Sequence, residues 1–136
     1  MTVSNAAPPS TVRISLSNDL GTIAFARMVI RNLMPPLDES QEPLFYGALT
    51  EIVTNAIEEH HRIETDADVE ITVVTGTEAL IKVTDSGTGF DTDAERTSDD
   101  DSGLGLMISR TVVPGLDIDS GPGGTTVTLP YPGVGA

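Results

Sequence analysis

The chain has 136 residues, no cysteine and a formal net charge of −14, from 21 acidic and 7 basic side chains. This length suffices for one domain with its own core, and the lack of cysteine excludes disulfides, thiol catalysis and thiolate metal sites. The negative charge argues against a nucleic-acid-binding protein, which needs a basic surface, and suits a partner that has one.

Residues 1–10 are rich in Ala, Pro, Ser and Asn and have neither the basic start nor the apolar centre of a signal peptide. No apolar run approaches the length of a membrane span. We therefore expect a cytoplasmic protein with no membrane contact. It would have a disordered N-terminal arm over 1–10, a single domain over 11–130 and a flexible tail over 131–136.

The first part of the domain is predicted to contain one strand and two helices. Apolar and polar residues alternate over 11–17, which indicates a half-buried strand. Apolar residues at helical spacing predict an amphipathic helix over 20–34, capped by residues 17–19. The same spacing predicts a longer helix over 41–61, with Ser40 as its cap.

Two polar residues, Glu51 and Asn55, accompany the apolar stripe of the longer helix. They are four residues apart and so share a face. A solvated face is the common fate of such a pair, but apolar neighbours on both sides favour a functional role here. The helix ends at Glu58-Glu59-His60-His61-Arg62, where adjacent histidines diverge by about 100°, so we expect a solvated helix end rather than a metal site.

Two strands follow, over 68–75 and 79–84, and the second leads into Asp85. Asp85 shares a strand face with Ile81 and Val83 and is therefore directed toward the core. A buried carboxylate without partners is costly. Asp85 therefore indicates either a ligand-recognising acid or, because Asp-Ser-Gly is common in turns, an ordinary turn.

Residues 91–102 carry six acidic side chains and almost nothing apolar, which predicts a mobile loop. The loop ends at Gly103-Leu104-Gly105-Leu106, which opens a predicted helix over 104–113. Glycines at a helix start leave backbone N–H groups free to face an anion, which the helix dipole favours. This segment is a candidate phosphate site.

The last two strands are predicted over 116–120 and 125–129, and Thr125 puts a hydroxyl group on the core-facing side of the second. The element order is then β-α-α-β-β-loop-α-β-β. It predicts an α+β fold, a two-layer sandwich whose mixed, mostly antiparallel sheet has its helices on one face.

Four motifs in this order resemble those of the Bergerat-fold (GHKL) ATPases, the superfamily of gyrase and the histidine kinases. Glu51-x-x-x-Asn55 resembles the N box, and Asp85-Ser-Gly-Thr-Gly89 resembles the first glycine box. Gly103-Leu-Gly-Leu106 resembles the second glycine box, and Gly124-Thr125 resembles the final Gly-Thr pair. The short chain and the segment Glu51-Ile-Val-Thr-Asn-Ala-Ile57 are most similar to the anti-sigma-factor serine/threonine kinases.

The resemblance implies an ATP site with Asp85 at its base. Asp85 would accept a hydrogen bond from the adenine amino group, with Thr125 and a water molecule assisting. Gly87 and Gly89 would let the backbone pass close to the base. The resemblance also implies a phosphate site in the backbone amides of Gly103, Leu104, Gly105 and Leu106, covered by residues 91–102 as a lid.

The same resemblance implies the catalytic roles. Asn55 would ligate a Mg²⁺ ion that bridges the phosphates, which suits an oxygen ligand. Glu51 would act as general base on an incoming Ser or Thr hydroxyl. The family's histidine four residues after the asparagine is Glu59 in this chain, and His60 follows one residue later.

A kinase of this family would bind a sigma factor, phosphorylate a STAS-domain antagonist and form a homodimer through the sheet edge and first helix. However, Leu104 stands where these kinases usually carry an arginine that meets the terminal phosphate. The alternative is therefore a nucleotide-binding anti-sigma protein that sequesters its partner with little or no phosphoryl transfer. An ATPase-like signalling adaptor without a sigma partner is a third alternative.

Overall fold

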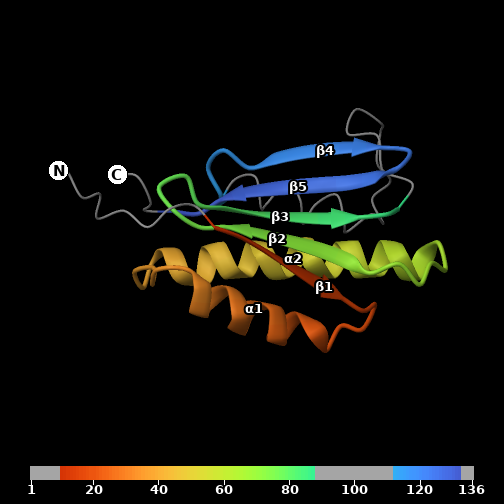
Figure 1. Cartoon of the computed structure of the whole chain (residues 1–136), viewed down its shortest axis with the longest axis horizontal. Helices are drawn as coiled ribbons and strands as arrows, with labels where there is room; N and C mark the ends of the chain where they lie inside the picture. Colours follow the sequence, from red (N-terminus) through yellow and green to blue (C-terminus); the bar gives the residue numbers. More distant parts are fainter. Residues whose placement is uncertain (1–9, 88–111, 133–136) are drawn as a thin grey trace.

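Alternating apolar side chains build one sheet, and two amphipathic helices cover one of its faces (Figure 1). The structure, a computed structural model, describes residues 10–87 and 112–132. The elements of these ranges are, in chain order, β1 (Thr11–Leu16), α1 (Thr22–Leu33), α2 (Gln41–Arg62), β2 (Val69–Val74), β3 (Leu80–Asp85), β4 (Asp117–Gly121) and β5 (Gly124–Pro130). Each begins and ends within two residues of its predicted bounds.

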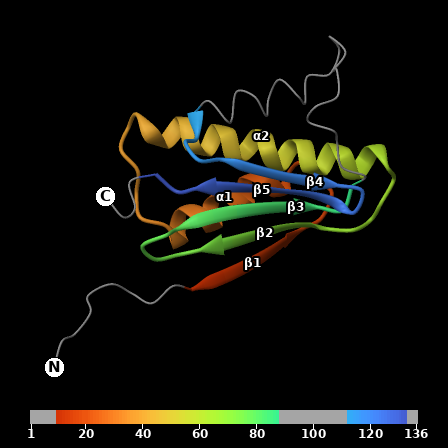
Figure 2. The same cartoon turned by 90° about the horizontal axis from the view of Figure 1, so that it is seen from above.

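The strands of the described residues form a single sheet in the order β1-β2-β3-β5-β4, in which every pairing is antiparallel. Figure 2 shows the strands side by side, with β1 and β4 at the two edges. Because β3 and β5 are neighbours, Asp85 and Thr125 lie opposite each other although they are 40 residues apart in sequence. The sheet topology thus brings two predicted site residues together.

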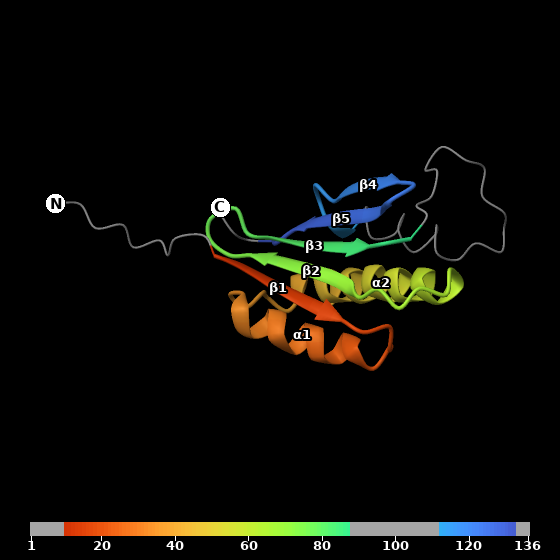
Figure 3. The same cartoon turned by 45° about the vertical axis from the view of Figure 1, so that its right-hand side comes forward.

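Both helices lie on the same side of the sheet, as the rotated view in Figure 3 shows. Alternate residues of β2 and β3, such as Ile71 and Ile81, are fully buried beneath them. On the helix side the largest fully buried residues are Ile30, Phe45, Leu49 and Ile57. The predicted α+β two-layer sandwich is confirmed.

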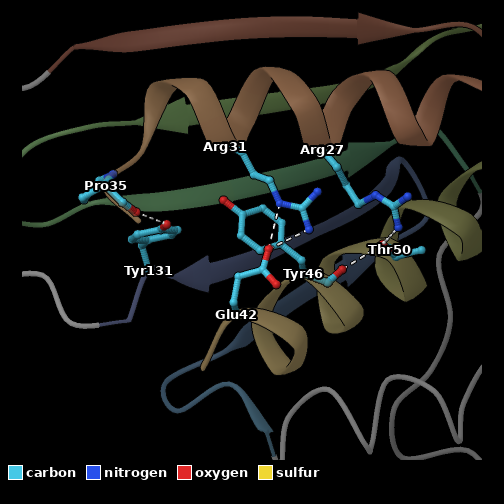
Figure 4. Close-up of polar contacts among 7 residues, drawn as sticks. All are labelled: Arg27, Arg31, Pro35, Glu42, Tyr46, Thr50 and Tyr131. Atoms are coloured by element: carbon cyan, nitrogen blue, oxygen red, sulfur yellow. Dashed lines mark hydrogen bonds and ion pairs between the residues drawn. The ribbon is translucent and has the colours of Figure 1, made fainter. Parts of the chain in front are cut away.

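Polar contacts join α1 to α2 (Figure 4). Arg27 donates from Nη1 to the hydroxyl of Thr50 at 3.0 Å. Arg31 donates from Nε to Glu42 at 2.9 Å, and its guanidinium lies 4.4 Å above the ring centre of Tyr46. These contacts fix α1 along the first half of α2, away from the helix end that meets Asp85.

An aromatic cluster joins the end of β5 to the start of α2. The ring of Phe45 meets the rings of Tyr46 and Tyr131 edge to face, at centroid distances of 5.3 and 5.0 Å. The hydroxyl of Tyr131 donates to the carbonyl of Pro35 in the α1–α2 connection (Figure 4). The last described residues are therefore tied to the helical layer.

The predicted helix caps are met in part at α1 and replaced at α2. Residue 21 is the N-cap of α1, and Oδ1 of Asp19, within the predicted cap segment, accepts its backbone N–H at 2.9 Å. Asn18 donates from Nδ2 to two carbonyls of the α2–β2 connection, at 3.0 and 2.9 Å. At α2, Asp38 accepts from the backbone N–H of Ser40 and so takes the role predicted for the Ser40 side chain. Short polar side chains compete for the same backbone groups, so sequence alone does not separate them.

Four predicted segments lie wholly or mostly outside the described residues: the arm over 1–10, the tail over 131–136, the acidic loop over 91–102 and the helix over 104–113. The last two residues of that helix are described, and Val113 is buried in the core. Among the described helices, none combines the length and apolar character that a membrane crossing requires.

Candidate functional site

Polar residues gather where the end of β3, the start of β5 and the second half of α2 meet. β3 ends in Asp85, whose side chain lies on the helix-facing side of the sheet, in line with the buried Ile81 and Val83. Its neighbour across the ladder is Thr125, only 5% exposed. The predicted core-facing carboxylate and hydroxyl therefore lie side by side.

The carboxyl group of Asp85 is anchored through one oxygen. Oδ1 accepts the backbone N–H of Gly87 at 2.8 Å and that of Thr125 at 3.2 Å. Among the described residues, no hydrogen bond reaches Oδ2. Burial raises the pKa of Asp85 above its ordinary value of 3.8, and the two N–H groups only partly offset this effect. The site therefore holds a fixed acid with one oxygen available to a ligand.

The hydroxyl of Thr125 continues the polar row toward β4, where it forms a 2.8 Å hydrogen bond with the hydroxyl of Ser120. The residue before it, Gly124, has φ +138°, in the region that favours glycine. A Cβ atom there would overlap the carbonyl oxygen of Asp85. Glycine at position 124 is thus required for the close approach of β5 to the end of β3.

Gly87 is required on the other side of Asp85. A Cβ atom at this position would overlap Cγ of Glu59 and lie 3.1 Å from Oδ1 of Asp85. Glu59 comes from the last turns of α2, where it also forms an ion pair with Arg62. The contact shows that the turn after β3 lies directly against the end of α2.

Glu51, Asn55 and Glu59 form a polar stripe on α2, because successive members are four residues apart. With Glu59 against the turn after β3, Asn55 lies about 6 Å and Glu51 about 12 Å farther along the helix axis. Both residues are half-buried rather than fully solvated. Nδ2 of Asn55 is buried without a hydrogen-bond partner among the described residues, which suggests that a ligand completes its environment.

The predicted solvated helix end at the histidine pair is wrong for one of its two residues. His61 is exposed, but His60 is fully buried and belongs to the site. Its Nδ1 lies 2.9 Å from Oδ1 of Asn18, and its Nε2 accepts the backbone N–H of Ser86 at 2.9 Å. Helical spacing could have found it, because His60 follows the buried Ala56 by four residues.

The remaining predicted site residues lie outside the described residues: Gly89, Gly103, Leu104, Gly105 and Leu106. In the described part of the chain, no three His, Cys, Asp or Glu side chains gather closely enough to hold a metal ion by themselves.

Comparisons with known proteins agree with this geometry. A family model described as a histidine kinase-like ATPase domain matches residues 9–131. A similar solved structure is that of the RsbU and RsbW domains of Rv1364c from Mycobacterium tuberculosis, with 23% sequence identity and a TM-score of 0.65. The match covers 92% of this chain and 32% of that one, so this chain spans about a third of its length. No curated protein sequence matches the chain.

Proposed function

The chain belongs to the family of histidine kinase-like ATPase domains, and from this premise we propose that it is a Mg-ATP-dependent anti-sigma-factor serine/threonine kinase. It would bind a sigma factor and transfer the terminal phosphoryl group of ATP to a Ser or Thr of a STAS-domain antagonist. The observation that carries the proposal is the half-buried Asp85, whose carboxyl group is fixed by two backbone N–H groups and keeps one oxygen available.

The adenine end of ATP fits the turn after β3. Oδ2 of Asp85 can accept a hydrogen bond from the exocyclic amino group, and burial, which raises the pKa of this carboxyl group, shields that hydrogen bond from water in part. The glycine at position 87 keeps the backbone free of a side chain next to this acid. Thr125, beside Asp85, would help to hold the base through a water molecule.

The phosphate end fits the middle of α2. Asn55 lies one turn before Glu59, and Nδ2 of its amide group is buried without a hydrogen-bond partner among the described residues. Its carboxamide oxygen suits Mg²⁺, a hard cation that takes oxygen ligands and retains several waters. The ion would supply charge neutralisation at the phosphates. The amides of residues 103–106 would hold the phosphates at a helix start.

Glu51, one further turn along α2, would act as general base. Its carboxylate would take the proton of the incoming Ser or Thr hydroxyl, whose oxygen forms a bond to the terminal phosphorus. The bond from that phosphorus to the bridging oxygen breaks, and ADP leaves. Glu51 is one turn from Asn55 on the same face of α2, so its carboxylate would be near phosphates held at Asn55.

An edge strand and an apolar helix face support a homodimer. β1 is an edge of the sheet, and α1 follows it directly in the chain. Near this edge Leu20, Phe25 and Met28 are 48%, 55% and 53% exposed, unusually high for large apolar side chains. We propose that a second copy pairs here, that the sigma factor binds to this same part of the molecule, and that the net charge of −14 favours a basic partner surface.

Leu104 favours a second candidate function. Without an arginine between the two glycines, the terminal phosphate loses a cation that is worth orders of magnitude in transfer rate. A protein that binds Mg-ATP and sequesters a sigma factor without transfer would have the same adenine and metal sites. The two functions differ only in the phosphoryl-transfer step.

One set of assays separates these possibilities. ATP binding is measured by calorimetry with and without Mg²⁺, and transfer from γ-labelled ATP is followed to purified STAS-domain proteins of the same organism. The kinase requires that Glu51→Ala abolishes transfer and leaves the ATP affinity within about threefold. Asn55→Ala should remove the Mg²⁺ dependence of binding.

The matched control is Glu58→Ala, which removes an exposed carboxylate from the same helix. It should change neither binding nor transfer. Tight ATP binding without transfer to any STAS protein supports the sequestering function. Wild-type protein that binds no adenine nucleotide contradicts both functions.

A further inference from the structure

Two residues that carry no role in the proposed chemistry, Asn18 and His60, are connected to the turn that holds Asp85. His60 is fully buried on α2, and Asn18 lies in the β1–α1 connection. A buried polar side chain is costly unless its hydrogen bonds are satisfied. Both nitrogens of this ring are satisfied, and one of the partners is the backbone of Ser86.

The hydrogen bonds define the protonation of the His60 ring. The backbone N–H of Ser86 can only donate, so Nε2 must accept and carries no proton. The proton is then on Nδ1, which donates to Oδ1 of Asn18 at 2.9 Å. The amide group of Asn18 is oriented by its own donor, because Nδ2 bonds to the carbonyls of Thr65 and Ala67. The ring is therefore neutral and fixed at both ends.

We propose that His60 is a positioning residue for nucleotide recognition, which holds the Asp85–Gly87 turn in place through the backbone N–H of Ser86. The proposal depends on the proposed ATP site. Ser86 lies between Asp85 and Gly87, the acid and the glycine that would meet the adenine base. A shift of the Ser86 backbone would move the N–H of Gly87 and with it the anchored oxygen of Asp85.

The arrangement also explains why the histidine is at position 60. The ring accepts a hydrogen bond from the Ser86 amide of the turn, while the neighbouring Glu59 lies against Gly87. Two successive residues of α2 thus hold the same turn, one through a hydrogen bond and one through van der Waals contact. Three connections meet at this point, since Asn18 also ties the β1–α1 and α2–β2 segments together.

Two substitutions of His60 separate positioning from simple stability. His60→Gln retains an acceptor near the position of Nε2, and His60→Asn retains a donor near Nδ1 but loses the acceptor for Ser86. The ATP dissociation constant is measured for each by calorimetry, together with thermal unfolding. His60→Asn should weaken ATP binding about tenfold, as expected for one lost buried hydrogen bond, and His60→Gln should stay within about threefold of wild type. The control is Glu58→Ala, which changes an exposed side chain of the same helix and should not change the affinity.

Hydrogen exchange of the Ser86 amide provides a readout that needs no nucleotide. In the wild type this amide should be protected although the Ser86 residue is exposed, and His60→Asn should speed its exchange about tenfold. If the Ser86 amide of the wild-type protein exchanges at the rate of an unprotected amide, the proposal is wrong. This measurement does not depend on whether a variant folds. Equal ATP affinity in folded His60→Asn and wild type overturns it as well. Wild-type protein that binds no ATP overturns the proposed function itself, and nucleotide positioning with it.

Discussion

Thr125 donates its backbone N–H to Oδ1 of Asp85 across the β3–β5 ladder, at 3.2 Å. Gly87 donates to the same oxygen from the other side. A carboxyl group held in this way cannot rotate to exchange its oxygens without losing two hydrogen bonds. The orientation of Asp85 is therefore set by the fold before any ligand arrives, which lowers the cost of binding.

Asp85→Asn should abolish most of the ATP affinity and leave the fold intact. The new carboxamide can keep Oδ1 toward Gly87 and Thr125, but it then presents an NH₂ group where Oδ2 was. Two donors would face each other at the adenine amino group, so we expect at least about tenfold weaker binding in calorimetry. An unchanged dissociation constant would remove Asp85 from the proposed site.

The same substitution should stabilise the protein at neutral pH. Burial raises the pKa of Asp85 above 3.8, so the native state binds this proton up to a higher pH than the unfolded chain does. The protonated form of Asp85 contributes to the free energy of unfolding. This contribution is fully present below pH 3.8 and is lost as the pH rises through the raised pKa of the native state. Asn cannot ionise, so the gain of Asp85→Asn in denaturant unfolding should be largest near pH 7 and shrink toward pH 3.8.

The control for this pH series is Asp117→Asn, at an exposed position of the edge strand β4. Asp117→Asn should not raise the free energy of unfolding at neutral pH by a comparable amount. A gain of Asp85→Asn that is the same at every pH would mean that burial of the charge is not its cause. An ionised acid at this position lowers the free energy of unfolding at neutral pH. Its presence is consistent with selection for binding rather than for stability.

Gly124→Ala should destabilise the protein by about 2–4 kcal/mol, because a positive φ and a steric overlap act together. The new Cβ would meet the carbonyl of Asp85, a backbone atom that cannot move aside. Gly123→Ala is the matched control, since a Cβ atom there has nothing within 4 Å. It should change the free energy of unfolding by less than about 0.5 kcal/mol. Equal effects of the two substitutions would contradict the close approach of β5 to β3.

The sequence predicted the elements well because each strand and helix has a clear apolar period. β3 is an example: Ile81 and Val83 are buried, and the same alternation correctly directs Asp85 to the helix layer. Spacing of four along α2 likewise predicts that Glu51 and Asn55 share a face. Local periodicity thus explains most of the fold and the core-facing orientation of the site residues.

Contacts between distant segments were not predictable in the same way. The pairing of Asn18 with His60 joins residues 42 apart, and nothing local in the sequence marks it. The cap prediction at Asn18 has the same origin, because its side chain also suits a helix cap. The role of Glu59 against Gly87 depends on the arrangement of α2 and the sheet, which only the folded structure defines.

Gly87→Ala should reduce the free energy of ATP binding by more than it reduces the free energy of unfolding. The added methyl group would overlap Cγ of Glu59, a side chain that can move, but it would also crowd Oδ1 of Asp85. Combining it with Glu59→Ala removes the atom that is struck. A double-mutant cycle in denaturant should then give a favourable coupling of about 1 kcal/mol. Strictly additive effects on unfolding would show that the two residues do not touch.

Substitutions on α1 test the proposed homodimer. Phe25 and Met28 lie one turn apart on its exposed face, near the edge strand β1, and burying them against a second copy would contribute apolar area to the interface. Phe25→Asp or Met28→Asp would place a charge in that interface, so light scattering after size exclusion should change from the mass of a dimer to that of a monomer. Leu44→Asp is the control, because Leu44 is equally exposed but lies in the first turn of α2. A wild type that is monomeric at micromolar concentration, or a Leu44→Asp variant that dissociates as Phe25→Asp does, would contradict pairing through β1 and α1.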